Sequence, residues 1–228
     1  MIDHEIPILC YVTAPAAASG SALAEKIAAV SAAGVDWVQI REKDFPGREL
    51  AALTREAVAR RSAARIIVND RLDVAVTERA GGVHLGEAGL PVADVAKWVN
   101  RCESGVVVSD QGAASQFPVP ASGDFLIGAS CHSLEGAKSA VRDGADYIFF
   151  GPVFATPSKA KFGEPQGPKR LAAVCNAVPV PVLAIGGITL ENAGECIAAE
   201  AAGIAAIRLF QDASDPRHVV STLKSLRR

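Results

Sequence analysis

The sequence predicts an α/β protein that forms one closed (β/α)8 barrel, the TIM barrel, over residues 1–228. Three observations support this prediction. Eight short apolar runs of β-forming residues recur along the chain, Ala- and Leu-rich helical stretches separate them, and 228 residues suffice for eight such units in one domain. A doubly wound open sheet is the alternative, but the GxGxxG motif that usually follows its first strand is absent.

The predicted strands are bounded by turn-forming residues and alternate with helical stretches, so we expect them to pair in parallel. In chain order they are Ile8–Val12, Trp37–Ile40, Ile66–Val68, Gly82–Leu85, Phe125–Ala129, Tyr147–Phe150, Val182–Ile185 and Ile204–Ile207.

The predicted helices show apolar residues at helical spacing and recognisable ends. Gly34 closes the first helix, and Ser133 and Thr189 are expected N-caps of two later ones. The stretch 102–123 contains several Gly and Pro residues and is expected to be an irregular insertion. The apolar faces of the first two helices are Leu23, Ile27 and Val30, followed by Leu50, Leu53, Ala57 and Val58.

Composition excludes several classes of protein. Half of the residues are apolar, which excludes wholesale disorder, and the net charge of −2 argues against a protein that coats nucleic acid or an anionic membrane. No apolar run reaches the roughly 18 residues of a membrane helix. The segment Met1–Leu9 lacks the pattern of a signal peptide. We therefore expect a cytoplasmic protein that binds neither nucleic acid nor membrane.

Active sites of such barrels lie where the strands end. After the second strand, Gln39, Arg41 and Lys43 share one face by strand alternation. Two cations and an amide at the barrel mouth suit a phosphate or pyrophosphate group. The alternative is a structural ion pair of Arg41 with Glu42 or with an acid on a neighbouring strand.

Polar residues also follow the third, fourth and fifth strands. Asn69 and Asp70 end the third, where Asp70 could hold Mg²⁺ beside an anion or simply cap a turn. His84 either contacts substrate or is a buried structural residue. Ser130 and His132 share a face after the fifth strand, but no GxSxG motif accompanies them, so they do not indicate a hydrolase.

The loop after the sixth strand carries Thr156, Ser158 and Lys159. Two hydroxyls and a cation on such a loop suit phosphate binding, and the alternative is an ordinary solvated loop.

The ends of the seventh and eighth strands are the usual phosphate site of these barrels. Gly186 and Gly187 allow backbone N–H groups to approach an anion closely. Ile207 and Arg208 follow the eighth strand, and Arg208 could join the same site.

Six ordered segments resemble the thiamine phosphate synthase family, and the resemblance extends from about Tyr11 to Phe210. The segments are QIREKD (39–44), VNDRLDVA (68–75), GVHLGE (82–87), GASCHSLEGA (128–137), DYIFFGPVFATPSK (146–159) and AIGGIT (184–189).

The resemblance implies a (β/α)8 barrel that couples hydroxymethylpyrimidine diphosphate with thiazole phosphate and releases pyrophosphate, with Mg²⁺ as cofactor. It implies that pyrophosphate leaves first and that the thiazole nitrogen captures the resulting cation. Such a reaction needs a cationic, metal-assisted cradle for the leaving group. The partners are then small phosphorylated thiamine precursors. Members of the family often self-associate, so the resemblance is compatible with a homo-oligomer, but the sequence does not fix the oligomeric state.

The resemblance also assigns roles to residues of this chain. Arg41, Lys43, Ser130, His132 and Lys159 become the candidate catalytic residues. The candidate metal ligands are Asp70 and Glu87. The candidate substrate-binding residues are Gln39, Asn69, His84, Thr156, Ser158, Gly186, Gly187, Ile207 and Arg208.

Three departures from the family pattern stand out. Gly89 occupies the position of a second metal-binding Asp, and Glu87 is the expected substitute. Arg208 stands where a Ser usually follows the eighth strand, and the 102–123 stretch is longer than usual.

These departures keep two alternatives open. A thiazole tautomerase of the TenI type shares the barrel, isomerises thiazole carboxylate phosphate and uses a His that matches His132. A barrel that binds thiamine precursors without turnover is the other. We favour the synthase because Arg41, Lys43, Asn69 and Asp70, which a tautomerase does not need, are all present.

Overall fold

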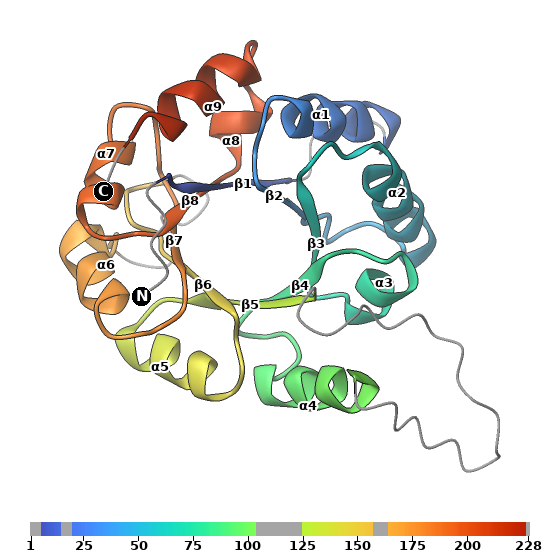
Figure 1. Cartoon of the computed structure of the whole chain (residues 1–228), viewed down its shortest axis with the longest axis horizontal. Coiled ribbons are helices and arrows are strands. Elements are labelled where there is room, and N and C mark those ends of the chain that lie inside the picture. The colour runs from blue at the N-terminus through green and yellow to red at the C-terminus, as the bar shows by residue number, and fades with distance from the viewer. Residues whose placement is uncertain (1–5, 15–19, 104–124, 157–163, 227–228) are drawn as a thin grey trace.

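The fold is a closed barrel of eight parallel strands, each next to its sequence neighbours, with the first strand paired to the last (Figure 1). The computed structural model describes residues 6–14, 20–103, 125–156 and 164–226. The strands are β1 (Ile8–Val12), β2 (Trp37–Ile40), β3 (Arg65–Asn69), β4 (Gly82–Leu85), β5 (Leu126–Cys131), β6 (Tyr147–Phe150), β7 (Val182–Ile185) and β8 (Gly203–Ala206).

Helices form the outer ring around the strands (Figure 1). They are α1 (Gly20–Ala32), α2 (Gly47–Arg60), α3 (Leu72–Thr77), α4 (Val92–Glu103), α5 (Leu134–Arg142), α6 (Gly167–Cys175), α7 (Ala193–Ala198), α8 (Arg208–Gln211) and α9 (Pro216–Lys224).

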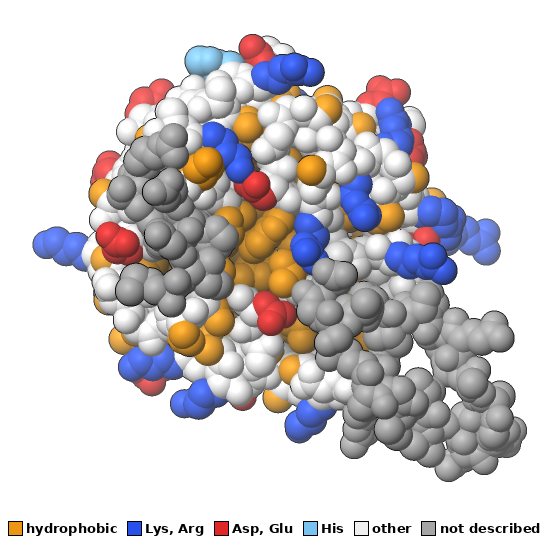
Figure 2. Space-filling model, in the orientation of Figure 1, with side chains coloured by type: hydrophobic (Ala, Val, Ile, Leu, Met, Phe, Trp, Pro, Cys, Tyr) orange, Lys and Arg blue, Asp and Glu red, His pale blue; other side chains and the backbone are white. Residues whose placement is uncertain are grey.

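Side chains fill the inside of the barrel, and Figure 2 shows apolar groups at the centre of the ring. Trp37, His84, Tyr147 and Phe149 form one aromatic cluster, with the Trp37 and Tyr147 rings 4.7 Å apart and the His84 and Phe149 rings 4.3 Å apart. A Cβ on Gly128 would clash with the Tyr147 ring, so this glycine makes room for it. The core is therefore packed, and a substrate can bind only at a barrel mouth.

The barrel confirms the predicted fold class and five of the eight strands with unchanged bounds. Three strands differ by one or two residues. β3 gains one residue at each end, and β5 lies one to two residues later than expected. β8 begins at Gly203, because that residue pairs with Ile8. Ile207 does not belong to β8 but precedes α8, with φ −93° and ψ −80°.

The predicted helix ends are partly right. Gly34 follows α1 with φ +103°, a conformation that glycine adopts without strain. Ser133 caps α5, since its hydroxyl accepts the N–H of Gly136 at 3.0 Å. The Thr189 prediction is partly right: α7 begins only at Ala193, with Asn192 before it, but Thr189 caps the turn that leads into it, because its carbonyl oxygen accepts the N–H of Ala193 at 3.1 Å. Thr189 and Asn192 also hydrogen-bond each other's backbone in this turn.

The predicted apolar helix faces are buried, apart from Val58, which is half-buried. Of the expected insertion at 102–123, residues 102 and 103 belong to the end of α4, and 104–123 lie outside the described residues. None of the described helices combines the length and the apolar character that a bilayer crossing requires.

Candidate active site at the carboxyl ends of the strands

A chain of side-chain hydrogen bonds connects the ends of β2 and β3. Gln39 Nε2 donates to Asn69 Oδ1 at 2.8 Å, and Asn69 Nδ2 donates to Asp70 Oδ2 at 2.6 Å. Gln39 is only 2% exposed, and its Oε1 accepts no hydrogen bond from any described residue. A buried amide oxygen without a donor is costly, so this atom is suited to accept an N–H group from a ligand.

Asp70 is held in place from two sides. Its backbone has φ +58°, a left-handed conformation that Asp tolerates better than most residues. Its Oδ1 accepts the backbone N–H of Gly86 at 2.8 Å, while Oδ2 accepts Asn69. A carboxylate has about four acceptor positions, so both oxygens can still bind a cation.

Gly89 lies directly beside this carboxylate. A Cβ at residue 89 would lie 2.6 Å from Asp70 Oδ1, too close for a normal contact, so glycine makes room for the Asp70 carboxylate in its present position. Glycine supplies no side-chain ligand there. Within the described ranges, no three His, Cys, Asp or Glu residues come together as a metal cluster. The donor set fits a Mg²⁺ ion that takes one protein carboxylate and receives its other ligands from substrate phosphates and water.

Glu87 is exposed and approaches the end of β5. Burial, and to a smaller extent the Glu87 charge, raise the pKa of Cys131 to about 12. No hydrogen bond connects Glu87 to Asp70 among the described residues. Its assignment as a metal ligand stays a prediction.

Thr13, just beyond β1, fixes the segment after β2. Its hydroxyl donates to Glu42 Oε1 at 2.5 Å and accepts the backbone N–H of Arg41 at 2.9 Å. Glu42 is 4% exposed, and its burial raises the pKa of its carboxyl. The Glu42 carboxylate is thus hydrogen-bonded to Thr13. No described residue forms an ion pair with Arg41. The alternative interpretation, a structural ion pair of Arg41 with Glu42 or with an acid on a neighbouring strand, is therefore not found among the described residues.

Arg41 and Lys43 differ in their placement. β2 ends at Ile40, so the strand alternation that groups both with Gln39 does not continue to them. Arg41 is half-buried, and its positive charge, after burial, helps to lower the pKa of His84 to about 3. This places the Arg41 charge toward the barrel interior. Lys43 is exposed in the following turn.

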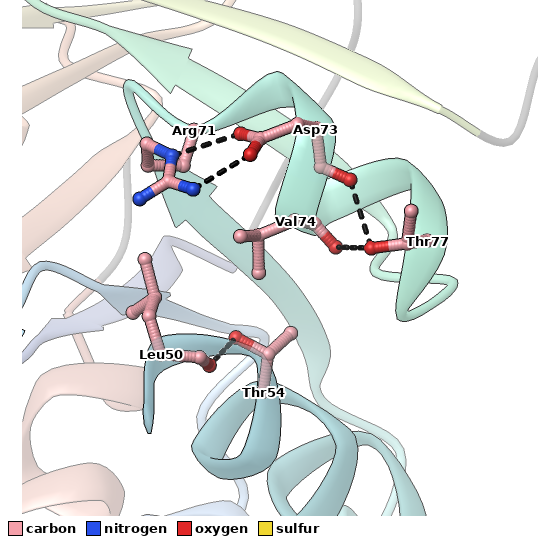
Figure 3. Close-up of polar contacts among 6 residues, drawn as sticks. All are labelled: Leu50, Thr54, Arg71, Asp73, Val74 and Thr77. Carbon is pink, nitrogen blue, oxygen red and sulfur yellow. Dashed lines mark hydrogen bonds and ion pairs between the residues drawn. The ribbon is translucent and has the colours of Figure 1, made fainter. Parts of the chain in front are cut away.

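Arg71, although adjacent to Asp70 in sequence, forms an ion pair with Asp73 at the start of α3. Its Nε and Nη2 donate to the two Asp73 oxygens at 2.9 and 2.6 Å (Figure 3). The hydroxyl of Thr77 donates to the backbone of Asp73 and Val74 in the same helix. The charge of Arg71 is therefore paired within the start of α3, whereas Arg41 has no ion-pair partner among the described residues.

A buried network positions Ser130. His84 Nε2 lies 2.9 Å from Ser130 Oγ, and His84 Nδ1 lies 3.1 Å from the Tyr147 hydroxyl. His84 is 1% exposed and stays neutral at physiological pH, because burial lowers its pKa. One ring nitrogen then donates and the other accepts. His84 is therefore a buried positioning residue that orients Ser130 at the end of β5.

His132 lies after β5 and hydrogen-bonds through Nδ1 to the backbone oxygen of Gly151. A carbonyl oxygen can only accept, so Nδ1 carries the proton. In the neutral ring, Nε2 is then the basic nitrogen.

The loops after β6 and β7 are joined edge to edge. Val153 N donates to Ile185 O at 2.9 Å, and Phe154 N donates to Gly186 O at 3.0 Å. A Cβ on Gly187 would lie 2.5 Å from Ala155 O, and the φ of this residue is +67°. These contacts explain the glycine pair structurally, whether or not it binds an anion.

The remaining predicted site residues divide by position. Thr156 is half-buried at the end of the β6 loop, whereas Ser158 and Lys159 lie outside the described residues. Ile207 and Arg208 follow β8, which pairs with β7, so they stand next to the Gly186 loop. Arg208 is exposed as the first residue of α8.

Sequence reasoning missed two residues of the site. Thr13 carries a signal, since a hydroxyl directly after a strand lies at the barrel mouth. Tyr147 carries another, since a tyrosine in a fully buried run needs a partner for its hydroxyl. Neither signal identifies the partner.

Comparison with known proteins shows which family this chain resembles. The family described as thiamine monophosphate synthase matches residues 9–114 and 109–210. The thiamine-phosphate synthase of Chlorobium luteolum is 36% identical over 222 residues, covering 96% of this chain and 92% of its own. That of Methanoculleus marisnigri is 39% identical over 199 residues, covering 86% and 82%.

A solved structure shows the same likeness in three dimensions. Thiamine phosphate pyrophosphorylase from Pyrococcus furiosus superposes with a TM-score of 0.70 and 28% identity, covering 97% of this chain and 95% of its own. Sequence and structure agree over nearly the whole length. The chain belongs to the thiamine monophosphate synthase family.

Proposed function

We propose that this protein joins hydroxymethylpyrimidine diphosphate to thiazole phosphate, giving thiamine phosphate and pyrophosphate. One observation carries the proposal beyond family membership. The Gln39–Asn69–Asp70 chain and the unpaired Arg41 converge at the mouth, which combines an amide acceptor, a carboxylate and a cation. This combination of groups suits a diphosphate on an amino-substituted heterocycle: the cation pairs with phosphate, the carboxylate can hold a divalent cation, and the amide oxygen accepts an amino N–H.

The proposed reaction requires stabilisation of the charge on the leaving group and requires no proton transfer. The bond between the pyrimidine methylene carbon and the diphosphate oxygen breaks, and its electron pair leaves with pyrophosphate. The lone pair of the thiazole nitrogen then forms the new carbon–nitrogen bond. No proton moves in either step, which agrees with a site whose best-placed histidine, His84, remains neutral.

The pyrimidine is expected to bind over the aromatic cluster of the barrel. Gln39 Oε1, buried and without a donor, accepts an N–H of the ring substituent. Ser130, oriented by His84, contacts the pyrimidine or the diphosphate.

The diphosphate is expected to bind between Arg41, Lys43 and Asp70, with Lys159 from the β6 loop. Asp70 would hold Mg²⁺, which supplies positive charge against the leaving pyrophosphate. Arg41 adds charge-assisted hydrogen bonds that strengthen as negative charge develops on the leaving group.

The thiazole phosphate is expected to bind where the β7 and β8 loops meet. Gly186 and Gly187 offer backbone N–H groups, and the Ile207–Arg208 segment begins the short helix α8 beside them. Thr156 and Ser158 are the hydroxyl ligands proposed on the neighbouring loop.

One observation favours a second activity, isomerisation of thiazole carboxylate phosphate. The bond from His132 Nδ1 to Gly151 O leaves Nε2 as a base facing away from that carbonyl. A tautomerase needs such a base and does not need the diphosphate site.

A paired turnover assay tests the proposal. One reaction contains both precursors and Mg²⁺ and follows thiamine phosphate, and the other contains only the thiazole carboxylate phosphate and follows its isomerisation. Thiamine phosphate formation supports the synthase. Isomerisation without coupling would replace it with the tautomerase.

Two variants test whether Arg41 contributes to the activity. Arg41→Ala is expected to lower kcat/KM more than tenfold, because charge-assisted hydrogen bonds contribute about 1.5–3 kcal/mol. Arg48→Ala removes an exposed arginine on α2 and should leave the activity unchanged. Equal effects of the two substitutions would contradict the assignment of Arg41.

A further inference from the structure

We propose that Thr13 is a positioning residue for the reaction, because its side chain orients the peptide that carries Arg41. The inference rests on the proposed function, in which Arg41 faces the leaving group. It gives a role to the end of β1, a strand that supplies none of the groups expected to contact substrate. Thr13 is 0% exposed, so it acts through Arg41 and not by contact with substrate.

The strand pairing of β2 stops before Arg41. The last register pairs of β2 join Gln39 to Val12 of β1 and Ile40 to Val68 of β3. Beyond Ile40 the ladder of the barrel no longer fixes the backbone. A contact outside the ladder has to hold the next peptide if the side chain of Arg41 is to keep one direction.

Thr13 supplies this contact through its backbone N–H and both functions of its hydroxyl. Its N–H donates to Gln39 O at 2.9 Å, and its Oγ1 accepts the N–H of Arg41 at 2.9 Å. Its hydroxyl donates to Glu42 Oε1 at 2.5 Å. Three contacts from one buried residue fix the orientation of segment 39–42 as well as its position. The β-branched side chain of Thr13 is itself restricted in rotamer, so the holding group is rigid.

The hydrogen bonds run in one direction through the hydroxyl. The backbone amide of Arg41 can only donate, and the carboxylate of Glu42 accepts, so the hydroxyl of Thr13 accepts from the first and donates to the second. Hydrogen bonds that share a hydroxyl in this way polarise and strengthen each other. Loss of the hydroxyl therefore releases the backbone of Arg41 and the side chain of Glu42 together.

No ion pair among the described residues fixes the side chain of Arg41, which is half-buried. Its charge nevertheless acts toward the barrel interior, where after burial it helps to lower the pKa of His84. A cation without an acidic partner takes its direction from its backbone. Because a misplacement of about 1 Å costs up to about a hundredfold in rate, the hold of Thr13 on this backbone matters for activity.

An isosteric substitution tests the inference. Thr13→Val keeps the shape and the backbone N–H and removes both hydroxyl contacts, so kcat/KM for thiamine phosphate formation should fall at least about tenfold. Thr13→Ser returns the hydroxyl and should restore most of the activity. Thr54→Val is the matched control, because the Thr54 hydroxyl is equally buried but donates to Leu50 O at 2.8 Å inside α2 (Figure 3). Equal losses in Thr13→Val and Thr54→Val would overturn the inference.

A double-mutant cycle separates positioning from general damage to the fold. In Arg41→Ala no guanidinium remains to be oriented, so adding Thr13→Val should change kcat/KM by less than about twofold. Glu42→Gln keeps an acceptor oxygen for Thr13 and removes the charge that strengthens the hydrogen bond. It should lower kcat/KM by a smaller factor, about threefold, that also disappears in Arg41→Ala, and it decides the matter if Thr13→Val does not fold. Full losses in the Arg41→Ala background would contradict the inference.

Hydrogen exchange gives a measurement that needs no turnover. The N–H of Arg41 is bonded to Thr13, so its exchange, followed by NMR, should become at least about tenfold faster in Thr13→Val. Thr13→Ser and Thr54→Val should leave this rate unchanged. An Arg41 amide that exchanges equally slowly in Thr13→Val would show that the hydroxyl does not hold this peptide.

The two proposals fail in different ways. If the parent protein forms no thiamine phosphate but Thr13→Val releases the Arg41 amide, the proposed reaction is wrong and the hold of Thr13 on Arg41 stands. If thiamine phosphate forms and Thr13→Val is as active as Thr54→Val, the reaction stands and the positioning role is wrong.

Discussion

Two buried tyrosines offer a controlled measurement of what a single hydroxyl contributes. Tyr147 is 1% exposed, and its hydroxyl lies 3.1 Å from His84 Nδ1. Tyr11 is 0% exposed, and its hydroxyl has no hydrogen-bond partner among the described residues. Burial raises the pKa of both hydroxyls above the ordinary value, so both are neutral at pH 7. Tyr→Phe is therefore the same chemical change in two different surroundings.

The expected effects have opposite signs. Tyr147→Phe leaves His84 Nδ1 buried and unpaired, which should lower the free energy of unfolding by about 1–3 kcal/mol. Tyr11→Phe removes a hydroxyl that was desolvated without compensation, so it should be neutral or stabilise by about 1 kcal/mol. The two variants should differ by roughly 2 kcal/mol. With a urea dependence of about 2.5 kcal/mol/M, that is a difference of roughly 0.8 M in the unfolding midpoint.

Urea unfolding followed by circular dichroism, under identical conditions for both variants and the parent, provides the assay. Similar losses in both variants would refute the reasoning, since they would show that the Tyr11 hydroxyl is hydrogen-bonded after all. A neutral Tyr147→Phe would show that the bond to His84 does not stabilise the barrel.

Three further predictions concern glycine, a buried acid and an ion pair. Gly203→Ala should lower the free energy of unfolding, measured by thermal unfolding, by about 3 kcal/mol or more, because its Cβ would clash with the backbone of β1. Gly194→Ala has open space around it and should raise the free energy of unfolding by about 0.5–1 kcal/mol by stabilising α7. The reverse order of the two variants would contradict the packing. Glu42→Gln should flatten the pH dependence of the unfolding free energy measured from pH 4 to 7. The pKa of Glu42 is raised in the folded protein, so its ionisation opposes folding as the pH rises above the ordinary value near 4.3, and an unchanged slope would refute this. Asp36 accepts a hydrogen bond from a buried N–H of β1 and forms an ion pair with Lys224, so Asp36→Ala should lower the free energy of unfolding by about 1–3 kcal/mol. Lys224→Ala removes only the ion pair and should lower it by about 0.5 kcal/mol. Equal losses in urea unfolding would show that only the ion pair matters.

Most of the fold follows from patterns within single segments. Apolar runs and helical faces are local, so the eight strands and the faces of α1 and α2 could be predicted to within two residues. The start of α7 could not, because the Thr189–Asn192 pair forms a turn whose sequence equally suits a helix N-cap.

The site was predictable as a set of residues and less so as a set of contacts. The strand-end rule places Gln39, Asn69 and Asp70 at one mouth, and they are hydrogen-bonded there. The commitment of Glu42 to Thr13 joins residues 29 apart in sequence, and no local pattern reveals it. Strand alternation failed for Lys43 because the strand ends three residues before it.

The pairing of β1 with β8 affects how the chain must fold during synthesis. Ile8 pairs with Gly203, so β1 keeps one unpaired edge until nearly the whole protein has left the ribosome. At about 5–20 residues per second, the intervening chain takes roughly ten to forty seconds to make. Throughout that time, the segment ILCYV is an exposed, uncharged strand edge that other nascent chains could join. Conditions that slow translation should therefore increase aggregation, and they should do so through the first strand.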